Sequence, residues 1–292
     1  MFFHGQRQKI LKKMNCIRRF LFENLNIQGA WVHLESGFEA VLHKRNYPDS
    51  AAKILGEMLV ATLYLAQILK TQARLSLQLK AQAPISQVFV DIKKTAETGE
   101  DLLFRAMAKP ADCSKPQEIV AGQNGILLMN LELPESQKPY QSAVALKGNS
   151  IGAIFENFIA QSEQTDIFIK LATSQNFAGG LFLKKLPDAD LKDKDGFVRL
   201  KILAETATDS ELLNDDFAHL MTKIFAEDSK SLRIFAPQNV RYHCPYDPQK
   251  ILNILKTMPP ENLAQMLDEN GKIHVHDDIC NFDYFFDFPR ST

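Results

Sequence analysis

The sequence is short of the residues that mark several large protein classes. It holds four cysteines in 292 residues, too few for a disulfide scaffold, so a reducing cytoplasm is the expected location. Lys plus Arg number 34 against 35 for Asp plus Glu, which removes the electrostatic case for a nucleic-acid-binding protein. The most membrane-like run, Met58–Leu69, is too short to span a bilayer. There is no Walker A loop, dinucleotide fingerprint or nucleophile-elbow serine, so no nucleotide is expected.

What the chain does have is enough apolar material for a large core. Hydrophobic residues make up 45% of it and charged residues 24%, which excludes general disorder. The length favours two domains over one. Phenylalanine is unusually common, with 20 residues against one tryptophan. That apolar area requires either a core or an exposed surface that binds other proteins.

The first nineteen residues are basic and contain no acidic residue. A transit peptide can have this pattern, but no apolar segment follows that would make a secretory signal. The favoured interpretation is a flexible basic tail over residues 1–14, with translation starting at Met1 or at Met14.

Hydrophobic periodicity predicts a mixed helix and sheet domain up to Pro187. Leu75, Leu77 and Leu79 alternate with polar residues, as in a half-buried strand. The segment from Asp49 or Ser50 to Leu69 is apolar on nearly every face, which predicts a central helix. Shorter helices are expected at 38–43 and 151–161, and other strands at 20–22, 27–34, 85–92, 102–107, 125–133, 142–146, 167–172 and 181–183.

The pattern changes after Pro187. Residues 188–195 are highly charged and predict the start of a solvated linker. Thr208 and Glu211 have the spacing of a capping box and predict the start of a helix. An apolar stripe at helical spacing follows, which predicts one amphipathic helix with the side chains Leu213, Phe217, Leu220, Met221 and Ile224. A short extended segment is expected at 232–235.

The last fifty residues predict a separate small module. Asp247 and Pro248 can begin a helix that stops at Pro259 and Pro260. A second short helix is expected to end near residues 270–271. Two strands, 272–276 and 282–288, then surround a turn.

The residues of this module suggest two kinds of metal chemistry. Strand alternation places His274 and His276 on one face, followed by Asp278, as in some metal-dependent hydrolases. Ordinary surface histidines are the favoured interpretation, because little chain is left to supply further ligands. Zinc is the second possibility, held by a set drawn from Cys244, Cys280, His243, His276 and Asp277. Two isolated, reduced cysteines are a slightly favoured alternative to zinc.

Several short strings, in this order and at this spacing, resemble the 33 kDa chaperonins, the redox-regulated heat-shock holdases of bacteria. They cover nearly the whole chain after residue 14 and are Arg19–Gly29, Leu55–Leu59, Gln161–Gln164, Ala178–Leu181, Glu211–Leu213, Val240–Tyr242 and Asp268–Ile273. The resemblance implies an α+β N-terminal chaperone domain (1–187), a metastable helical linker (188–240) and a C-terminal redox-switch module (241–292).

The resemblance also implies a zinc site that this chain departs from. In the family, a C-x-C and a C-x-x-C motif together supply four thiolates. Tyr246 and Asp277 stand here where the family has cysteine, so only Cys244 and Cys280 remain. Three outcomes stay open: zinc held by these cysteines with Asp277 and His276 or His243, a module that packs without metal, or a disulfide between Cys244 and Cys280. Weak or absent zinc is predicted, and peroxide alone is not expected to activate the protein.

The expected function is that of an ATP-independent holdase rather than an enzyme. Its partners are unfolded or oxidatively damaged proteins, with a homodimer forming on activation and no nucleic-acid or membrane partner. The resemblance implies that the linker stripe is covered at rest and binds clients when the linker is released. Cys16 and Cys113 match no family motif.

Overall fold

A computed structural model of the chain describes residues 15–69, 72–81, 85–94, 101–110 and 125–287. The predictions for residues 1–14 and for Cys113 lie outside these ranges. Helices and strands are mixed throughout, which confirms the predicted α+β class. Within the described ranges, no helix is long and apolar enough to cross a membrane.

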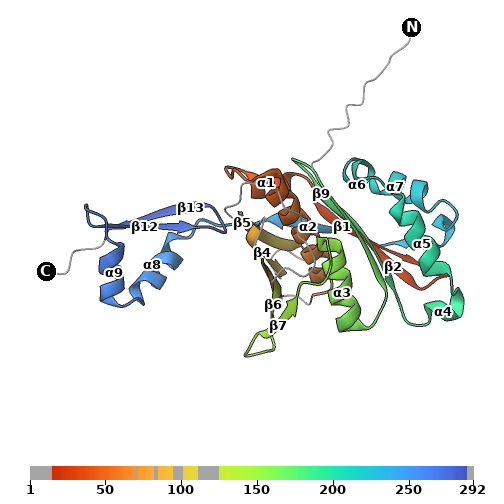
Figure 1. Cartoon of the computed structure of the whole chain (residues 1–292), viewed down its shortest axis with the longest axis horizontal. Helices are drawn as coiled ribbons and strands as arrows, with labels where there is room; N and C mark the ends of the chain where they lie inside the picture. The colour runs from red at the N-terminus through yellow and green to blue at the C-terminus, as the bar shows by residue number, and fades with distance from the viewer. Residues whose placement is uncertain (1–14, 70–71, 82–84, 95–100, 111–124, 288–292) are drawn as a thin grey trace, which may run out of the picture.

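A large sheet forms the body of the molecule (Figure 1). Its strands are β1 (Cys16–Phe22), β2 (Ile27–Leu34), β3 (Arg74–Lys80), β4 (Ile85–Lys94), β5 (Leu102–Pro110), β6 (Ile126–Glu132), β7 (Tyr140–Ala145), β8 (Ile167–Thr173), β9 (Ala178–Lys185), β10 (Leu232–Ile234) and β11 (Gln238–Tyr242). The order is β7-β6-β3-β4-β5-β11-β1-β2-β9-β8, with β10 also paired to β1. β11 lies parallel to β5. It therefore carries the segment just before Cys244 into the middle of the sheet.

Three helices cover one face of this sheet: α1 (Ser36–Leu42), α2 (Asp49–Ala66) and α3 (Ile151–Glu163). The predicted central helix is confirmed by α2, in which Met58, Leu59 and Leu63 are completely buried. The alternation of Leu75, Leu77 and Leu79 turns all three side chains towards this first core.

A second core lies on the opposite face of β1, β2, β8 and β9. β2 sends Ala30 and Val32 into the first core and Trp31 into the second. The second core is covered by α5 (Gly196–Glu205), α6 (Asp209–Asn214) and α7 (Phe217–Ile224). Gly29 pairs with Phe20 across the two strands, and a Cβ at Gly29 would overlap the Phe20 ring. The glycine therefore lets that ring lie across its neighbouring strand.

The linker region differs from its prediction in three places. The single helix expected after Thr208 is two helices, because Asp216 begins α7 by accepting hydrogen bonds from the amides of Ala218 and His219 at 3.0 and 3.1 Å. The Thr208 capping box is confirmed, at the start of α6. The charged segment expected to be solvated linker contains a short helix, α4 (Ala189–Lys192), with Ala189 buried. α5 and β11 were not predicted.

The C-terminal module consists of α8 (Pro248–Lys256), α9 (Pro260–Met266) and the hairpin β12 (Lys272–Asp277) and β13 (Phe282–Asp287). Asp247 begins α8 as predicted, since its carboxylate accepts a 3.0 Å hydrogen bond from the amide of Lys250. α9 ends at Met266, before the predicted end near residue 270. The module extends away from the large sheet (Figure 1). A 3-10 turn (Ser229–Ser231) precedes β10. The domain boundaries near residues 187 and 240 remain predictions.

Candidate functional sites: a covered apolar stripe and a cysteine turn

The predicted client-binding stripe is covered in this structure. Its five side chains lie on α6 and α7 in the second core, each exposed by 6% or less: Leu213, Phe217, Leu220, Met221 and Ile224. α7 is short, at eight residues, so its position depends on packing rather than on helix propensity. Whether the stripe binds other proteins remains a prediction.

The sheet face beneath α7 is unusual because it combines aromatic rings with polar groups. The Phe217 ring lies 5.8 Å from that of Trp31 and 5.9 Å from that of Phe20. Trp31 stacks on His33 at 5.0 Å. The guanidinium of Arg18 lies 5.6 Å from the centre of the Phe217 ring, within cation–π distance.

Several buried polar atoms in this region have no hydrogen-bond partner. Of five such side-chain atoms among the described residues, three lie on this sheet face (Arg18 Nε, Trp31 Nε1 and His33 Nδ1) and a fourth, Asp215 Oδ2, lies between α6 and α7. Burial lowers the pKa of His33 to about 4. Each unpaired buried polar group costs roughly 1–3 kcal/mol. Packing α6 and α7 on this sheet face therefore buries apolar surface, but the unpaired polar atoms offset part of the free energy that this burial contributes.

A buried carboxyl lies on α2, within electrostatic reach of Asp209 at the start of α6. The Glu57 side chain is 12% exposed. Burial raises its pKa to about 7; Lys53 acts against this rise and Asp209, the first residue of α6, adds to it. The Glu57 carboxyl therefore changes its charge near neutral pH, and the Asp209 carboxylate of α6 contributes to that pKa.

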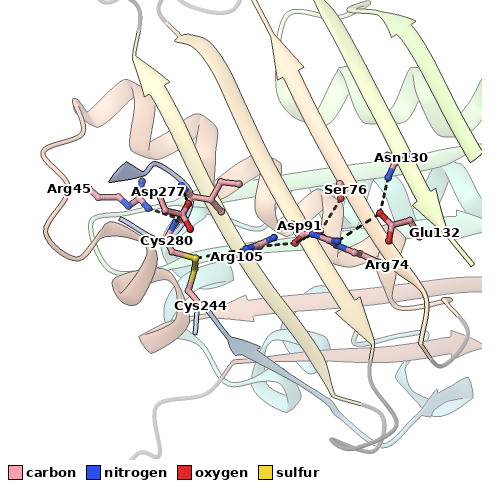
Figure 2. A network of polar contacts seen from close by, with 11 residues as sticks. Arg45, Arg74, Ser76, Asp91, Arg105, Asn130, Glu132, Cys244, Asp277 and Cys280 are labelled. Carbon is pink, nitrogen blue, oxygen red and sulfur yellow. Dashed lines mark hydrogen bonds and ion pairs between the residues drawn. A yellow bond between two sulfur atoms is a disulfide. The ribbon is translucent and has the colours of Figure 1, made fainter. Parts of the chain in front are cut away.

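The two predicted redox cysteines meet in a disulfide (Figure 2). Cys244 follows β11, and its neighbour His243 donates a backbone hydrogen bond of 2.9 Å to the Phe104 carbonyl on β5. Cys280 lies in the turn between β12 and β13, residues 277–281, which we name the cysteine turn. The Cα atoms are 5.5 Å apart, inside the normal range for a disulfide. Of the three outcomes left open by the sequence, the structure shows the disulfide.

The cysteine turn also contacts the body of the protein through charged side chains. Arg45, just after α1, donates hydrogen bonds of 2.9 and 2.8 Å to the carbonyls of Asp278 and Ile279. Lys109 on β5 forms a 2.6 Å ion pair with Asp278. Asn281 donates a longer bond of 3.4 Å to the Lys44 carbonyl. Four contacts thus hold this turn against β5 and the residues that follow α1.

A polar network extends from the disulfide across the large sheet (Figure 2). The guanidinium of Arg105 lies 3.9 Å from the Cys280 sulfur and forms a 2.8 Å ion pair with Asp91. Asp91 also pairs with Arg74 at 2.7 Å, and Arg74 lies 3.8 Å from Glu132. Burial by itself would raise the pKa of Asp91, but Arg74 and Arg105 together hold it below its ordinary value. Asp91 therefore stays charged and keeps Arg105 beside the sulfur.

The predicted metal ligands do not form a zinc site here. The sulfurs of Cys244 and Cys280 are bonded to each other, and the Asp277 carboxylate accepts hydrogen bonds from the amides of Ile279 and Cys280 at 2.9 and 3.2 Å. Tyr246 stacks on Tyr284 with ring centres 4.7 Å apart. No three His, Cys, Asp or Glu side chains in the described ranges are grouped to hold a metal ion. The residues present do not fit the four-ligand zinc set that the resemblance implies.

The histidines of β12 lie on one face, as strand alternation predicts, and both contact Asp283 on β13. His274 Nε2 and His276 Nδ1 both contact Asp283 Oδ1, at 2.7 and 2.9 Å. His276 and then His274 hold the pKa of Asp283 below its ordinary value. Asp278, the third residue of the predicted hydrolase string, pairs with Lys109 at 2.6 Å and also lies 3.8 Å from Nε2 of His276. Within the described ranges these side chains are not grouped to hold a metal ion, so the hydrolase interpretation gains no support.

Sequence reasoning missed the arginines of both sites. Arg45 and Arg105 act on residues more than 170 positions away in the chain, and no local pattern marks them. Trp31 lies on a predicted strand, but Arg18 lies before the predicted strand at 20–22, since β1 begins at Cys16. Their pairing across β1 and β2 could therefore not be predicted. Of the cysteines outside the turn, Cys16 is buried with a free thiol.

The comparisons with known proteins agree over nearly the whole chain. The family model described as "Hsp33 protein" matches residues 15–287. The 33 kDa chaperonin of Methylobacillus flagellatus is 32% identical over 93% of this chain and 91% of its own. That of Chromobacterium violaceum is 30% identical over 93% and 90%. The crystal structure of the 33 kDa chaperonin from Thermotoga maritima superposes with a TM-score of 0.76 over 94% of both chains at 19% identity, which shows a shared fold.

Proposed function

The chain belongs to the Hsp33 family, and from this premise we propose that it is an ATP-independent holdase chaperone. It binds unfolding proteins and prevents their aggregation under heat or oxidative stress. Its partners are unfolded or oxidatively damaged proteins in the cytoplasm, and it forms a homodimer when activated. It needs no nucleotide, catalyses no reaction, and binds neither nucleic acid nor membranes.

The observation that carries this proposal is the covered stripe on α6 and α7. A large apolar surface that is covered by short helices can be exposed without unfolding the first core. The unpaired Trp31, His33 and Arg18 atoms lower the cost of that exposure, because water pairs with them once α7 leaves. Released, the stripe offers aromatic and aliphatic side chains of the kind that bind unfolded proteins.

A metal-dependent hydrolase gains no support from these results. The relatives share the name of a chaperonin, and His274 and His276 are bound to Asp283 on an exposed strand face. We therefore retain the chaperone proposal alone.

The test is suppression of light scattering by a heat-unfolded client, such as citrate synthase, without nucleotide. The unheated wild type is expected to be weak, because its stripe is covered. Leu220→Asp places a charge in the second core and is expected to release α7, so that the unheated variant suppresses aggregation severalfold better. The single tryptophan, Trp31, reports the release as a red shift of its fluorescence.

The matched control is Ala218→Asp on the same helix. Ala218 is exposed and lies in the first turn of α7, where a negative charge is tolerated. This variant is expected to match the wild type in both fluorescence and scattering. A wild type that leaves scattering unchanged even after heating with oxidant would sink the holdase proposal.

A further inference from the structure

We propose that the Cys244–Cys280 disulfide fastens the C-terminal module to the body of the protein, so that oxidation closes this module and reduction loosens it. The direction is opposite to that of a switch in which oxidation releases a zinc-ordered module. The proposal rests on the fold and on the contacts of the cysteine turn, and it does not require the proposed chaperone activity.

The first step of the argument is the position of Cys244. It comes two residues after β11, which pairs with β5 and β1 inside the large sheet. The backbone bond from His243 to Phe104 extends this attachment to the residue before the cysteine. Cys244 is therefore part of the body, not of the module that follows it.

The second step is the position of Cys280 in the turn between β12 and β13. The disulfide spans 36 positions, and the segment that it encloses contains α8, α9 and β12. In the oxidised chain, the module is tied to the sheet both by the chain entering α8 and by the sulfur bond at the cysteine turn. Closing this loop restricts the unfolded module far more than the folded one, so it favours the folded module.

The third step is that few other contacts fasten the module. The Arg45 and Lys109 bonds hold the cysteine turn, but Lys109 and Asp278 are each about half exposed, and exposed ion pairs contribute little. Few side chains are buried among the described residues of the module, 245–287: only Leu255, Ile273, Cys280 and Tyr284 count as core. Such a small core depends on a cross-link or a metal. Since the residues do not fit zinc, the disulfide is what remains.

Arg105 makes Cys280 the sulfur that reacts with the oxidant. A guanidinium beside a thiol favours the thiolate, which is the nucleophilic form. With hydrogen peroxide as oxidant, the Cys280 thiolate attacks one peroxide oxygen and expels hydroxide, which leaves a sulfenic acid. The Cys244 thiol then attacks that sulfur, loses its proton, and displaces the oxygen as water. Two thiols and one peroxide thus give one disulfide and two waters.

The experiment is hydrogen exchange of the full chain, oxidised with peroxide or reduced with dithiothreitol. We expect amides around Leu255, Ile273 and Tyr284 to exchange at least about tenfold faster in the reduced chain, with α2 unchanged. Mass spectrometry should show the loss of two hydrogen atoms on oxidation, and Cys244→Ser should behave as the reduced wild type under both conditions. Cys16→Ser is the control and should keep the full response.

Three results would overturn the proposal. One is equal or faster module exchange in the oxidised chain, and another is a chain that peroxide leaves with both thiols free. The third is one tightly held zinc per reduced chain, since a metal would then order the reduced module. If redox-dependent protection is found in a protein that fails to suppress aggregation, the chaperone proposal fails and this one stands.

A second variant tests the contacts of the cysteine turn. Arg45→Gln removes the paired hydrogen bonds to Asp278 and Ile279 and should let Cys280 move away from Cys244. In a fixed glutathione redox buffer, we expect the ratio of disulfide to dithiol to fall about tenfold. Arg233→Gln is the matched control, because Arg233 is an exposed arginine of β10 that pairs with Glu23, and β10 pairs with the end of β1 opposite to the end that pairs with β11. An unchanged ratio of disulfide to dithiol in Arg45→Gln would show that the contacts of the cysteine turn do not stabilise the disulfide.

Discussion

At the scale of single residues, the two sites depend on contacts that sequence patterns do not contain. Cys244 and Cys280 could be identified because they match the family motif, and the replacement of its other two cysteines by Tyr246 and Asp277 is visible in the sequence itself. Arg45 could not, because its bond to Ile279 joins residues 234 positions apart. His33 could be placed on a strand, but its stacking on Trp31 and the lack of a hydrogen-bond partner for its Nδ1 depend on which helix covers that face.

His33 predicts acid sensitivity of the second core. Its folded pKa is about 4, below the ordinary value of 6.5, so the unfolded chain binds the extra proton and stability falls as pH drops from 6.5 towards 4. When the pH falls from 7 to 4.5, the free energy of unfolding of the wild type should fall by about 2 kcal/mol more than that of His33→Phe, a variant that keeps an aromatic ring against Trp31. Urea unfolding followed by circular dichroism measures both. The control is His219→Gln, at an exposed histidine, and its free energy of unfolding should fall as much as that of the wild type. An equally large fall in His33→Phe would contradict the prediction.

At the scale of helices and strands, patterns with a local cause were predicted and those with a tertiary cause were not. The Thr208 capping box is a contact between residues three apart, and it appears where the sequence places it. The break after α6 follows from Asp215 and Asp216, which the helical spacing of the stripe concealed. α5 was missed because Val198 and Ile202 are apolar yet more than half exposed, and because no side chain caps its start.

The buried Glu57 carboxyl of α2, whose pKa Asp209 of α6 also raises, predicts the opposite pH dependence. The pKa of Glu57 is raised from 4.5 to about 7, so its neutral form favours folding below pH 4.5 and that advantage is lost as pH rises to about 7. Glu57→Gln, which stays neutral, should therefore be more stable than the wild type by about 2 to 3 kcal/mol at pH 8 and by less than about 1 kcal/mol at pH 5. Chemical denaturation at the two pH values measures this. The control is Glu227→Gln, at an exposed glutamate of the linker, and its stability relative to the wild type should not differ between the two pH values. An effect of Glu57→Gln that does not change with pH would refute the raised pKa of Glu57.

At the scale of the whole molecule, one sheet serves three parts of the chain. Residues 16–185 supply most strands, the linker covers one face with α5 to α7 and adds β10 and β11, and the C-terminal module attaches where β11 ends. The family resemblance implied these three parts, but sequence periodicity could not show that the linker ends inside the sheet. A strand of five residues such as β11 carries too little pattern to be recognised.

This arrangement predicts the order in which a protease opens the oxidised chain. Within the described ranges, the first cuts should fall between residues 188 and 196 or around 228–231, because both segments are charged and have few apolar anchors. Leu191, inside the first of these segments, is 84% exposed, whereas Met58 to Leu63 on α2 are buried completely. Thermolysin or proteinase K digestion, followed by mass spectrometry, should release a stable N-terminal fragment ending near residue 190. Heating before digestion should speed the linker cuts severalfold and leave α2 intact, since α6 and α7 can leave the second core while the first remains folded. Early cleavage inside 58–69 would show that the two cores open together, and the division of the chain near Pro187 would then be wrong.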